Sequence, residues 1–311
     1  MQPEFPSSPK KPNIKTVAAA AGVSTATVSN AFNRPNQLSP EVRERVLKIA
    51  RELGYSGANP VARNLRRMST NTIGFVYSES LEFGINDPAC QQFLQGIAGA
   101  LESRGLGLLL LPYSTTANFE TVRDAAVDGI ILYSPPSNTP LLQVVKDRRL
   151  PAVFVDFPAR PDCTTIRVRD RLGGRALAEH LIQLGHKRFG VISSRLTEDF
   201  REGLSDWNRV QHDFYYPERE RLVGYRQAFE EANIDLSNSV KYSNADIARP
   251  CSVSGPSLLF WPLTTVRQDS EEKGCRAAKF LLEMLDGQAE ENRHSVLPVE
   301  LIVRKSTAKA R

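Results

Sequence analysis

Cysteine and histidine are scarce in this chain of 311 residues, which contains four of each. The cysteines lie far apart and form no C-x-x-C pair, a spacing that favours small buried side chains over a metal or redox centre. No two histidines are placed to share one helical face. The sequence therefore predicts no metal and no other cofactor. The cysteines are Cys90, Cys163, Cys251 and Cys275.

Long apolar runs are also missing. The longest, Leu106–Pro112, falls far short of the roughly 18 residues that a membrane-spanning helix needs, and it fits a buried strand. The segment Met1–Pro12 holds four prolines and two lysines without an apolar core, so we expect a disordered arm and not a secretory signal. These absences predict a cytoplasmic protein without a membrane partner, with nucleoid DNA within reach.

Sequence motifs of the common α/β enzymes are absent. The chain contains no P-loop, no G-x-S-x-G and no G-x-G-x-x-G segment, so an enzyme is not expected. The hydrophobic fraction of 41% and the charged fraction of 24% are ordinary for a soluble globular protein. A chain of this length suits two or three lobes.

Positive charge is concentrated at the N-terminus. Up to Thr70 there are 11 Lys/Arg and 4 Asp/Glu, a net charge of +7, whereas the remainder has 29 and 31, a net charge of −2. A compact basic module on a near-neutral body suits binding to the DNA backbone, because each Lys or Arg that reaches a phosphate releases condensed counterions. A small-molecule-binding protein without a DNA function is disfavoured by this module.

Three short helices are predicted in the basic module. Gly22 supplies the tight turn between the first two, and Ser24 and Ser39 are the N-caps of the second and third. Apolar residues at helical spacing form the inward stripes. The predicted helices are Lys15–Ala21, Thr25–Asn33 and one that begins at Pro40; the inward residues are Val17, Val28, Ala31, Phe32, Val42, Val46, Ile49, Ala50 and Leu53, with Tyr55 closing the module.

This periodicity also fits an ordinary three-helix bundle, but the residues themselves are more specific. They read Val17-Ala18-x-x-Ala21-Gly22-Val23-Ser24-x-x-Thr27-Val28-Ser29, then Phe32-Asn33, Ser39-Pro40 and Leu53-Gly54-Tyr55. The pattern resembles the helix-turn-helix DNA-binding domain of the lactose/galactose repressor (LacI/GalR) family and occupies residues 13–57. The resemblance implies a sequence-specific transcriptional regulator.

By position, the resemblance assigns six residues of the second helix to DNA. Small polar side chains near the N-terminus of a recognition helix let its backbone approach the floor of the major groove. Asn30 could pair bidentately with adenine. The base-reading positions are Thr25, Ala26 and Asn30, and the phosphate-contacting positions are Thr27, Ser29 and Asn33.

Residues 58–70 follow as a linker that is too short to be a stable helix by itself. A solvated interdomain connection is one interpretation. The resemblance implies a hinge that becomes helical only in a dimer on DNA, with Leu65 wedged into the minor groove and Ala62 facing it. Such a wedge bends the duplex and exposes more of its backbone to Arg63 and Arg66.

From Thr72 onward, apolar strands alternate with helical segments, which indicates a parallel sheet covered on both faces. The segments Ala178–His186 and Pro262–Val266 are similar to the family's periplasmic-binding-protein-like core. The predicted fold is therefore an N-terminal all-α helix-turn-helix domain plus an α/β core at 71–311 made of two doubly wound parallel-sheet lobes. The resemblance implies that this core binds an effector and forms a homodimer.

The expected effector site lies at the carboxyl ends of the strands, where doubly wound sheets bind ligands. That rule places Ser78, Ser134 and Asp156 at the mouth of the cleft, and by position the family's effector contacts fall on Ser78, Asp156 and Arg221. A carboxylate and a guanidinium are suitable partners for a sugar or a similar polar ligand. A helix-capping aspartate and a surface arginine are the alternative interpretation.

The second lobe is interrupted. Only 27 residues lie between Ile234 and Pro262, whereas another βαβ unit takes upward of roughly 30. We therefore expect this lobe to be depleted near residues 235–262. The sequence predicts a dimeric repressor that binds a pseudo-palindromic operator and is controlled by a small sugar-like effector. The alternative is a truncated family member that binds DNA but has lost its effector response.

Overall fold

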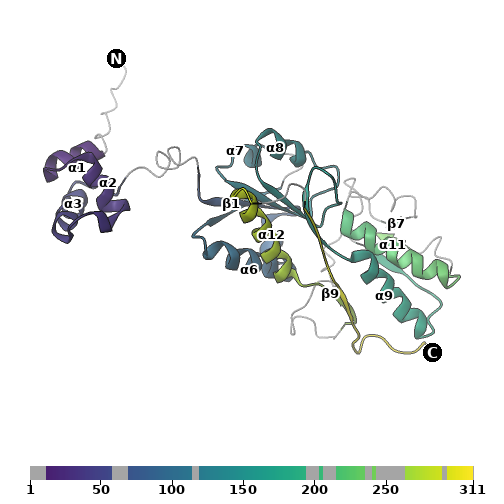
Figure 1. Ribbon diagram of the computed structural model, residues 1–311. Coiled ribbons are helices and arrows are strands. Elements are labelled where there is room, and N and C mark those ends of the chain that lie inside the picture. The colour runs from purple at the N-terminus through teal and green to yellow at the C-terminus, as the bar shows by residue number, and fades with distance from the viewer. Residues whose placement is uncertain are drawn as a thin grey trace, which may run out of the picture. The chain divides into compact units, whose positions relative to one another are not determined.

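The chain divides into two compact units, Met1–Thr70 and Asn71–Arg311 (Figure 1). The predicted N-terminal arm, the linker and most of the interrupted segment lie outside the residues that the structure describes. The computed structural model describes residues 12–57, 69–113, 119–193, 203–205, 215–234, 240–242, 263–288 and 293–310.

Three α-helices pack around a small apolar core within residues 12–57. Gly22, at a φ of 62°, ends the first helix and turns the chain into the second. The hydroxyls of Ser24 and Ser39 accept hydrogen bonds from the backbone N–H groups of Thr27 and Val42, which confirms both predicted N-caps. The elements are α1 (Ile14–Ala21), α2 (Thr25–Asn33), the 3₁₀ helix η1 (Pro35–Gln37) and α3 (Pro40–Glu52).

Two details of this unit differ from the sequence prediction. Asn13, which the pattern did not indicate, caps α1 by accepting two backbone N–H bonds of its first turn. Leu53 was expected to point inward but is 37% exposed, because α3 ends one residue earlier and the chain turns there. Tyr55 packs its ring edge against Phe32 instead, with the ring centroids 5.7 Å apart.

The second unit contains a six-stranded sheet in which all neighbouring strands are parallel. The strand order is β10-β5-β4-β3-β1-β2, so the winding direction reverses between β1 and β3. Doubly wound sheets bind ligands outside the carboxyl ends of the strands at such a switch point. The strands are β1 (Thr72–Tyr77), β2 (Gly107–Pro112), β3 (Gly129–Tyr133), β4 (Ala152–Val155), β5 (Thr164–Val168) and β10 (His294–Leu297).

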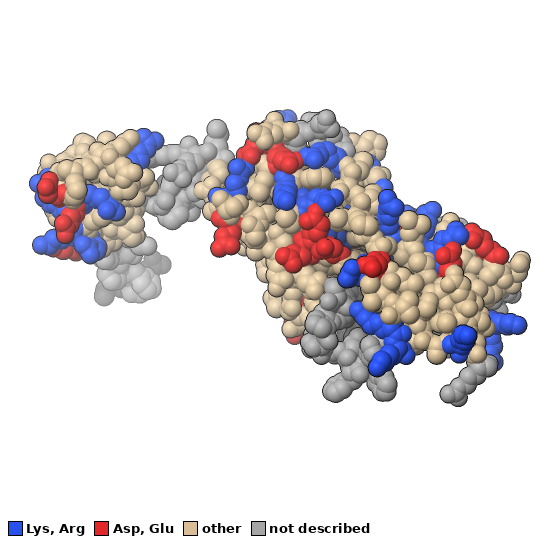
Figure 2. Space-filling model, turned by 60° about the horizontal axis from the view of Figure 1, so that its bottom comes forward, with Lys and Arg blue, Asp and Glu red and all other residues tan. Residues whose placement is uncertain are grey.

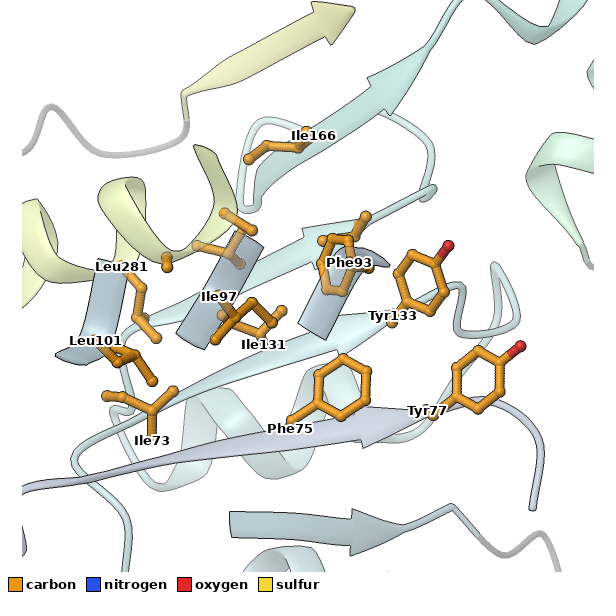
Figure 3. Close-up of a cluster of buried hydrophobic side chains, with 14 of the residues drawn as sticks. Ile73, Phe75, Tyr77, Phe93, Ile97, Leu101, Ile131, Tyr133, Ile166 and Leu281 are labelled. Atoms are coloured by element: carbon orange, nitrogen blue, oxygen red, sulfur yellow. The ribbon is translucent and has the colours of Figure 1, made fainter. Parts of the chain in front are cut away.

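Helices cover both faces of this sheet, which confirms the layering predicted from its continuous apolar strands. On one face, Phe93 and Ile97 of α6 and Leu281 of α12 pack over Phe75 and Ile131 (Figure 3). On the other face, α7 and α8 cover a second apolar cluster. These helices are α6 (Pro88–Glu102), α7 (Glu120–Asp124), α8 (Leu141–Asp147) and α12 (Ser270–Leu285), and the short α5 (Leu81–Asn86) follows β1.

Helices α6 and α12 touch backbone to backbone. A Cβ atom on Gly96 would lie 2.0 Å from the carbonyl oxygen of Glu271, and one on Gly274 would lie 2.0 Å from that of Phe93. Any side chain at either position would force the helices apart. This contact fixes the first turns of α12, which carry Lys273.

The second lobe is built on α9 (Asp170–Gln183) and α11 (Tyr216–Glu231), which also meet through paired glycines, Gly174 and Gly224. The described part of its sheet is small. It contains three strands of three residues each, β6 (Val191–Ser193), β8 (Val240–Tyr242) and β7 (Gly203–Ser205).

This small sheet corrects the prediction of a purely parallel second lobe. Strand β8 is parallel to β6 but antiparallel to β7. Only residues 194–202 separate β6 from β7, too few for the helical crossover of a dozen or more residues that parallel connections need. The described sheet of this lobe is therefore mixed.

Two further strands form a separate two-stranded sheet. Strand β11 (Glu300–Ile302) pairs antiparallel with β9 (Thr265–Arg267). A Cβ atom on Gly173 would lie 2.8 Å from the Val266 side chain, so α9 begins directly against β9. None of the helices in the described ranges is long and apolar enough to cross a membrane.

Candidate DNA-reading helix and ligand cleft

Helix α2 exposes the predicted base-reading residues on the N-terminal unit. Val28 and Ala31 face the core with at most 1% exposure. Thr25 and Ala26 consequently lie on the surface, and Asn30 is half-buried. Among the described residues, neither Thr25 nor Asn30 uses its side chain in a hydrogen bond. Their donors and acceptors are thus available for the edges of bases.

The predicted phosphate-contacting residues have partners along the same helix. The hydroxyl of Thr27 lies 2.9 Å from that of Ser24. The Asn33 amide donates to the Ser29 carbonyl oxygen at 2.9 Å and lies 3.4 Å from the Ser29 hydroxyl. These bonds orient the side chains, and each hydroxyl still has capacity for a phosphate oxygen because it can both donate and accept.

Basic side chains outnumber acidic ones around this helix. Residues 12–57 contain six Lys/Arg and three Glu, and all six cations are exposed. Over the face of the second unit shown in Figure 2, Lys and Arg are instead interspersed with Asp and Glu. The six cations are Lys15, Arg34, Arg43, Arg45, Lys48 and Arg51. The predicted hinge residues, Ala62, Arg63, Leu65 and Arg66, lie outside the described residues.

The structure brings Ser78, Ser134 and Asp156 together at the carboxyl edge of the large sheet, directly after β1, β3 and β4. Each donates its backbone N–H to the next strand, at 2.7 to 3.2 Å. Ser134 and Asp156 have φ values of 54° and 55°. Left-handed backbone is uncommon for residues other than glycine and concentrates at binding sites.

Asp156 is ion-paired within the first lobe. Its Oδ2 accepts from Nζ of Lys273 at 2.6 Å, and the Lys273 side chain is only 1% exposed. The ammonium group also lies 5.1 Å from the ring centroid of Tyr133, a favourable cation–π distance. Oδ1 of Asp156 is buried and has no hydrogen-bond partner among the described residues.

Arg221 reaches the same region from the second lobe. Its Nε donates to Oδ1 of Asp170, the first residue of α9, at 2.8 Å. Burial raises the pKa of Asp170 to about 6; Arg221 and Lys273 oppose the rise, and the charge of Asp156 adds to it. Oδ2 of Asp170 is likewise buried without a hydrogen-bond partner among the described residues.

We call Asp156, Lys273, Asp170 and Arg221 the charge row. The alternative interpretation of the sequence was a helix-capping role for Asp156 and a surface position for Arg221. In the structure, the Asp156 side chain is instead paired with Lys273, and Arg221 has a buried carboxylate partner, Asp170.

Sequence reasoning missed Lys273 and Asp170. A signal existed for each, because Lys273 shares a four-residue spacing with buried Ala277 and Leu281, and Asp170 shares one with buried Gly174 and Ala178. A charged residue on an apolar stripe indicates a buried partner.

Two further arginines near the ends of β5 and α9 have acceptor partners on α11. Glu220 accepts two bonds from Arg171, at 2.9 and 3.1 Å. The hydroxyl of Tyr216 accepts from Arg167 at 2.9 Å, and burial is the main cause of the raised pKa of Tyr216.

A helix-turn-helix unit with an exposed second helix, followed by a doubly wound α/β unit, is the architecture of a DNA-binding regulator. The family model described as bacterial regulatory proteins, lacI family, matches residues 13–57, and a periplasmic binding protein-like domain matches residues 251–307. An HTH-type transcriptional regulator of Mycolicibacterium smegmatis is 38% identical over 246 residues, which cover 76% of this chain and 67% of the relative. The chain belongs to the lacI family of bacterial regulatory proteins, and its relatives are transcriptional regulators, not enzymes.

Other similar proteins extend this result. The ribose operon repressor of Escherichia coli (strain K12) is 28% identical, with 72% of this chain and 63% of the relative covered. A LacI-family transcriptional regulator from Corynebacterium glutamicum of known structure is 27% identical, with a TM-score of 0.64 and coverage of 93% and 96%. The lac repressor dimer bound to operator and an anti-inducer, 22% identical with a TM-score of 0.69 and coverage of 96% and 100%, has the same fold.

These comparisons confirm the predicted family and the two-part fold. The chain spans about two thirds of the length of the curated relatives it matches, 63 to 67% for three of them.

Proposed function

We propose that this protein is a dimeric transcriptional repressor that binds a pseudo-palindromic operator in cytoplasmic DNA. The observation that carries the proposal is α2: Val28 and Ala31 are buried, Thr25 and Ala26 are exposed, and the side chains of Thr25 and Asn30 make no hydrogen bond within the described residues. A helix that is packed on one side and polar on the other can enter the major groove without losing core contacts.

Phosphate contacts supply the sequence-independent part of the affinity. Thr27, Ser29 and Asn33 of α2 are proposed to contact phosphates, and the exposed cations of the unit add to the attraction. Two half-sites about one helical turn apart match the symmetry of a dimer. Residues Ala62, Arg63, Leu65 and Arg66 are proposed to enter the minor groove between them, as the family resemblance implies.

The second unit is proposed to bind a small sugar or similar polar effector. Ser78, Ser134 and Asp156 share the carboxyl edge of the sheet beside the switch point, and Arg221 approaches from the second lobe. The similarity to a ribose operon repressor supports a sugar as the ligand class. Binding between the lobes would couple to the operator if the ligand prefers one arrangement of the lobes.

Operator binding is tested by selecting duplexes from a random library with the full chain and then measuring affinity over a series of salt concentrations. We expect a pseudo-palindromic consensus and an affinity that falls steeply with salt. An Asn30→Ala, Leu65→Ala double variant is expected to lose the sequence preference, whereas Asn138→Ala, an exposed asparagine of the second unit, retains it. Unchanged specificity in the double variant contradicts the proposal.

A second candidate is a regulator that binds DNA without responding to an effector. The three-residue strands of the described second-lobe sheet favour it, because a small sheet provides little rigid support for a ligand. Calorimetric titration of the full chain with sugars separates the two candidates. Saturable binding supports effector control, and its absence across a sugar panel supports the second candidate.

A further inference from the structure

The charge row uses only part of its hydrogen-bonding capacity. Lys273 occupies Oδ2 of Asp156 at 2.6 Å, and Arg221 occupies Oδ1 of Asp170 at 2.8 Å. The two pairs lie at the same edge of the sheet, because Asp156 donates its backbone N–H to Ile166 of β5 at 2.7 Å and Asp170 follows the end of β5 by two residues. Each aspartate therefore has one oxygen bound to a cation and one that is not.

The two remaining oxygens are buried. Asp156 and Asp170 are 6% and 4% exposed, and neither Oδ1 of Asp156 nor Oδ2 of Asp170 has a hydrogen-bond partner among the described residues. A buried acceptor without a donor is unfavourable and uncommon in native proteins. Two of them in one cluster can accept hydrogen bonds from donors that the described residues do not supply.

The cluster also joins the two lobes. Asp156 follows β4 and Lys273 lies in α12, both in the first lobe, whereas Asp170 begins α9 and Arg221 lies in α11. A group bound by both aspartates would therefore touch both lobes, which is the position from which a ligand can favour one lobe arrangement.

The charges of the row cancel, with two carboxylates and two cations. An ionised carboxylate can only accept hydrogen bonds, so the missing groups must be donors. A ligand that carried a net charge would leave that charge unbalanced in a poorly solvated site, which is strongly unfavourable. Hydroxyl groups of an uncharged molecule meet both conditions.

We propose that Asp156 and Asp170 form a paired acceptor site for two hydroxyl groups of one uncharged polyhydroxy ligand. Lys273 and Arg221 are positioning residues that hold the two acceptors and cancel their charge. The inference rests on the proposed effector binding, and it adds Asp170 and Lys273 to the site. Because the free oxygens are covered in this structure, the ligand reaches them when the lobes part.

Calorimetry on the full chain at pH 7.5 tests the charge rule with compounds that share a skeleton. The panel contains glucose and ribose as neutral compounds, gluconate and ribose 5-phosphate as anions, and glucosamine as a cation. We expect glucose or ribose to bind at least about 10-fold more tightly than its charged analogues, the effect of one lost hydrogen bond to a charged group. Equal or tighter binding of a charged analogue overturns the inference.

The second acceptor is tested by Asp170→Asn. The variant keeps the shape of the side chain but replaces one of the two oxygens by a donor, so we expect neutral-ligand affinity to fall by about 10-fold to 100-fold. The matched control is Asp147→Asn, at an exposed position of α8. Wild-type affinity in Asp170→Asn contradicts the proposed site.

The positioning role of Lys273 is tested by the preference for neutral over cationic ligands in Lys273→Met. Without the ammonium group the charge row carries an unbalanced negative charge, so the ratio of glucose affinity to glucosamine affinity is expected to fall by at least about 10-fold. Lys279→Met, at an exposed position of the same helix, should keep the wild-type ratio. An unchanged ratio in Lys273→Met overturns this role.

A double variant provides a second test in case Lys273→Met does not fold. Asp156→Asn with Lys273→Met removes both charges of the buried pair together, which proteins often tolerate. We expect this variant to fold, to bind the neutral ligand at least about 10-fold more weakly than wild type, and to keep a preference for the neutral ligand over the cationic one. Wild-type affinity in the double variant overturns the inference.

The same panel separates this inference from the proposed function. If no compound binds the wild-type chain, effector control fails and the inference fails with it. If glucose or ribose binds and Asp170→Asn binds equally well, effector control stands and only the paired acceptor site is wrong. Operator selection, which needs no ligand, reports independently on the DNA-binding part of the proposed function.

Discussion

The two lobes of the second unit share one construction device but differ in how their sheets are built. In each lobe a pair of helices meets through two glycines, Gly96 with Gly274 and Gly174 with Gly224. The first lobe adds six parallel strands with apolar clusters on both faces. The described second-lobe sheet has three-residue strands, and the buried apolar cluster that the described residues of this lobe form is Ala178, Ala228 and Phe229, on α9 and α11.

This difference indicates which interactions stabilise each lobe. Burial of large apolar side chains dominates in the first lobe, since such burial contributes most to folding. Among the described residues of the second lobe, the helix contact and ion pairs carry a larger share of the stabilising interactions, and exposed ion pairs contribute little. The second lobe is therefore expected to open first when the protein is stressed.

Removing Lys273 is expected to have the largest effect on the first lobe. Lys273→Met leaves the buried carboxylate of Asp156 without its cation, which should lower the free energy of unfolding by about 3 to 5 kcal/mol. Denaturant unfolding followed by circular dichroism measures the change. The control, Lys279→Met, lies at an exposed position of the same helix and should leave stability unchanged; equal stability of both variants refutes the buried pair.

Filling the glycine contacts compares the lobes directly. In Gly96→Ala and Gly224→Ala the new Cβ would meet backbone oxygens at 2.0 and 2.1 Å, so we expect each variant to lose roughly 3 kcal/mol. Hydrogen exchange should show faster exchange throughout the unit for Gly96→Ala but mainly in α9 and α11 for Gly224→Ala. Identical exchange patterns would mean that the lobes unfold as one.

The pH dependence of stability tests the buried carboxylate at the junction of the lobes. Burial raises the pKa of Asp170 to about 6, above its unfolded value near 4. The folded state therefore holds the proton more tightly, and this group contributes stability at low pH that is lost as the pH rises from about 4 to about 6. Asp156, Lys273, Arg221 and Tyr216 face the same group.

Asp170→Asn should remove that contribution. The difference in melting temperature between wild type and variant is expected to change between pH 4 and 6 in favour of the variant and then to stay constant up to pH 8. A difference that does not vary with pH contradicts the raised pKa. The Asp147→Asn control should follow the wild-type profile.

The smallest expected effect is a stabilisation. Gly99 also lies in α6, but a Cβ there would meet nothing within 4 Å. Gly99→Ala should therefore raise the free energy of unfolding by about 0.5 to 1 kcal/mol, through the lower entropy of the unfolded chain. A loss of stability in both Gly96→Ala and Gly99→Ala would show that the helix contact is not the cause.

Local features of the fold could be predicted from the sequence. The N-caps Ser24 and Ser39 and the span of α2 follow from residues within one turn of each other. The layering of the large sheet follows from continuous apolar strands, and the placement of Ser78, Ser134 and Asp156 follows from strand ends. Each of these features depends on a short stretch of chain.

Features that depend on distant segments could not be predicted. Lys273 meets Asp156 across 117 positions of sequence, and Arg221 meets Asp170 across 51. Similarly, β10 joins the edge of the first sheet beside β5 after the chain has passed through the second lobe. Periodicity identifies which side of an element is buried, but it does not identify the residue opposite.

The second unit is proposed to control DNA binding by the first through a bound sugar. Fluorescence anisotropy of the selected operator duplex with the full chain, at fixed salt and titrated with the neutral sugar that binds most tightly in calorimetry, measures this control directly. We predict that saturating sugar changes operator affinity by at least about 5-fold, and that operator changes sugar affinity by the same factor. Saturable sugar binding with unchanged operator affinity would contradict this proposed control.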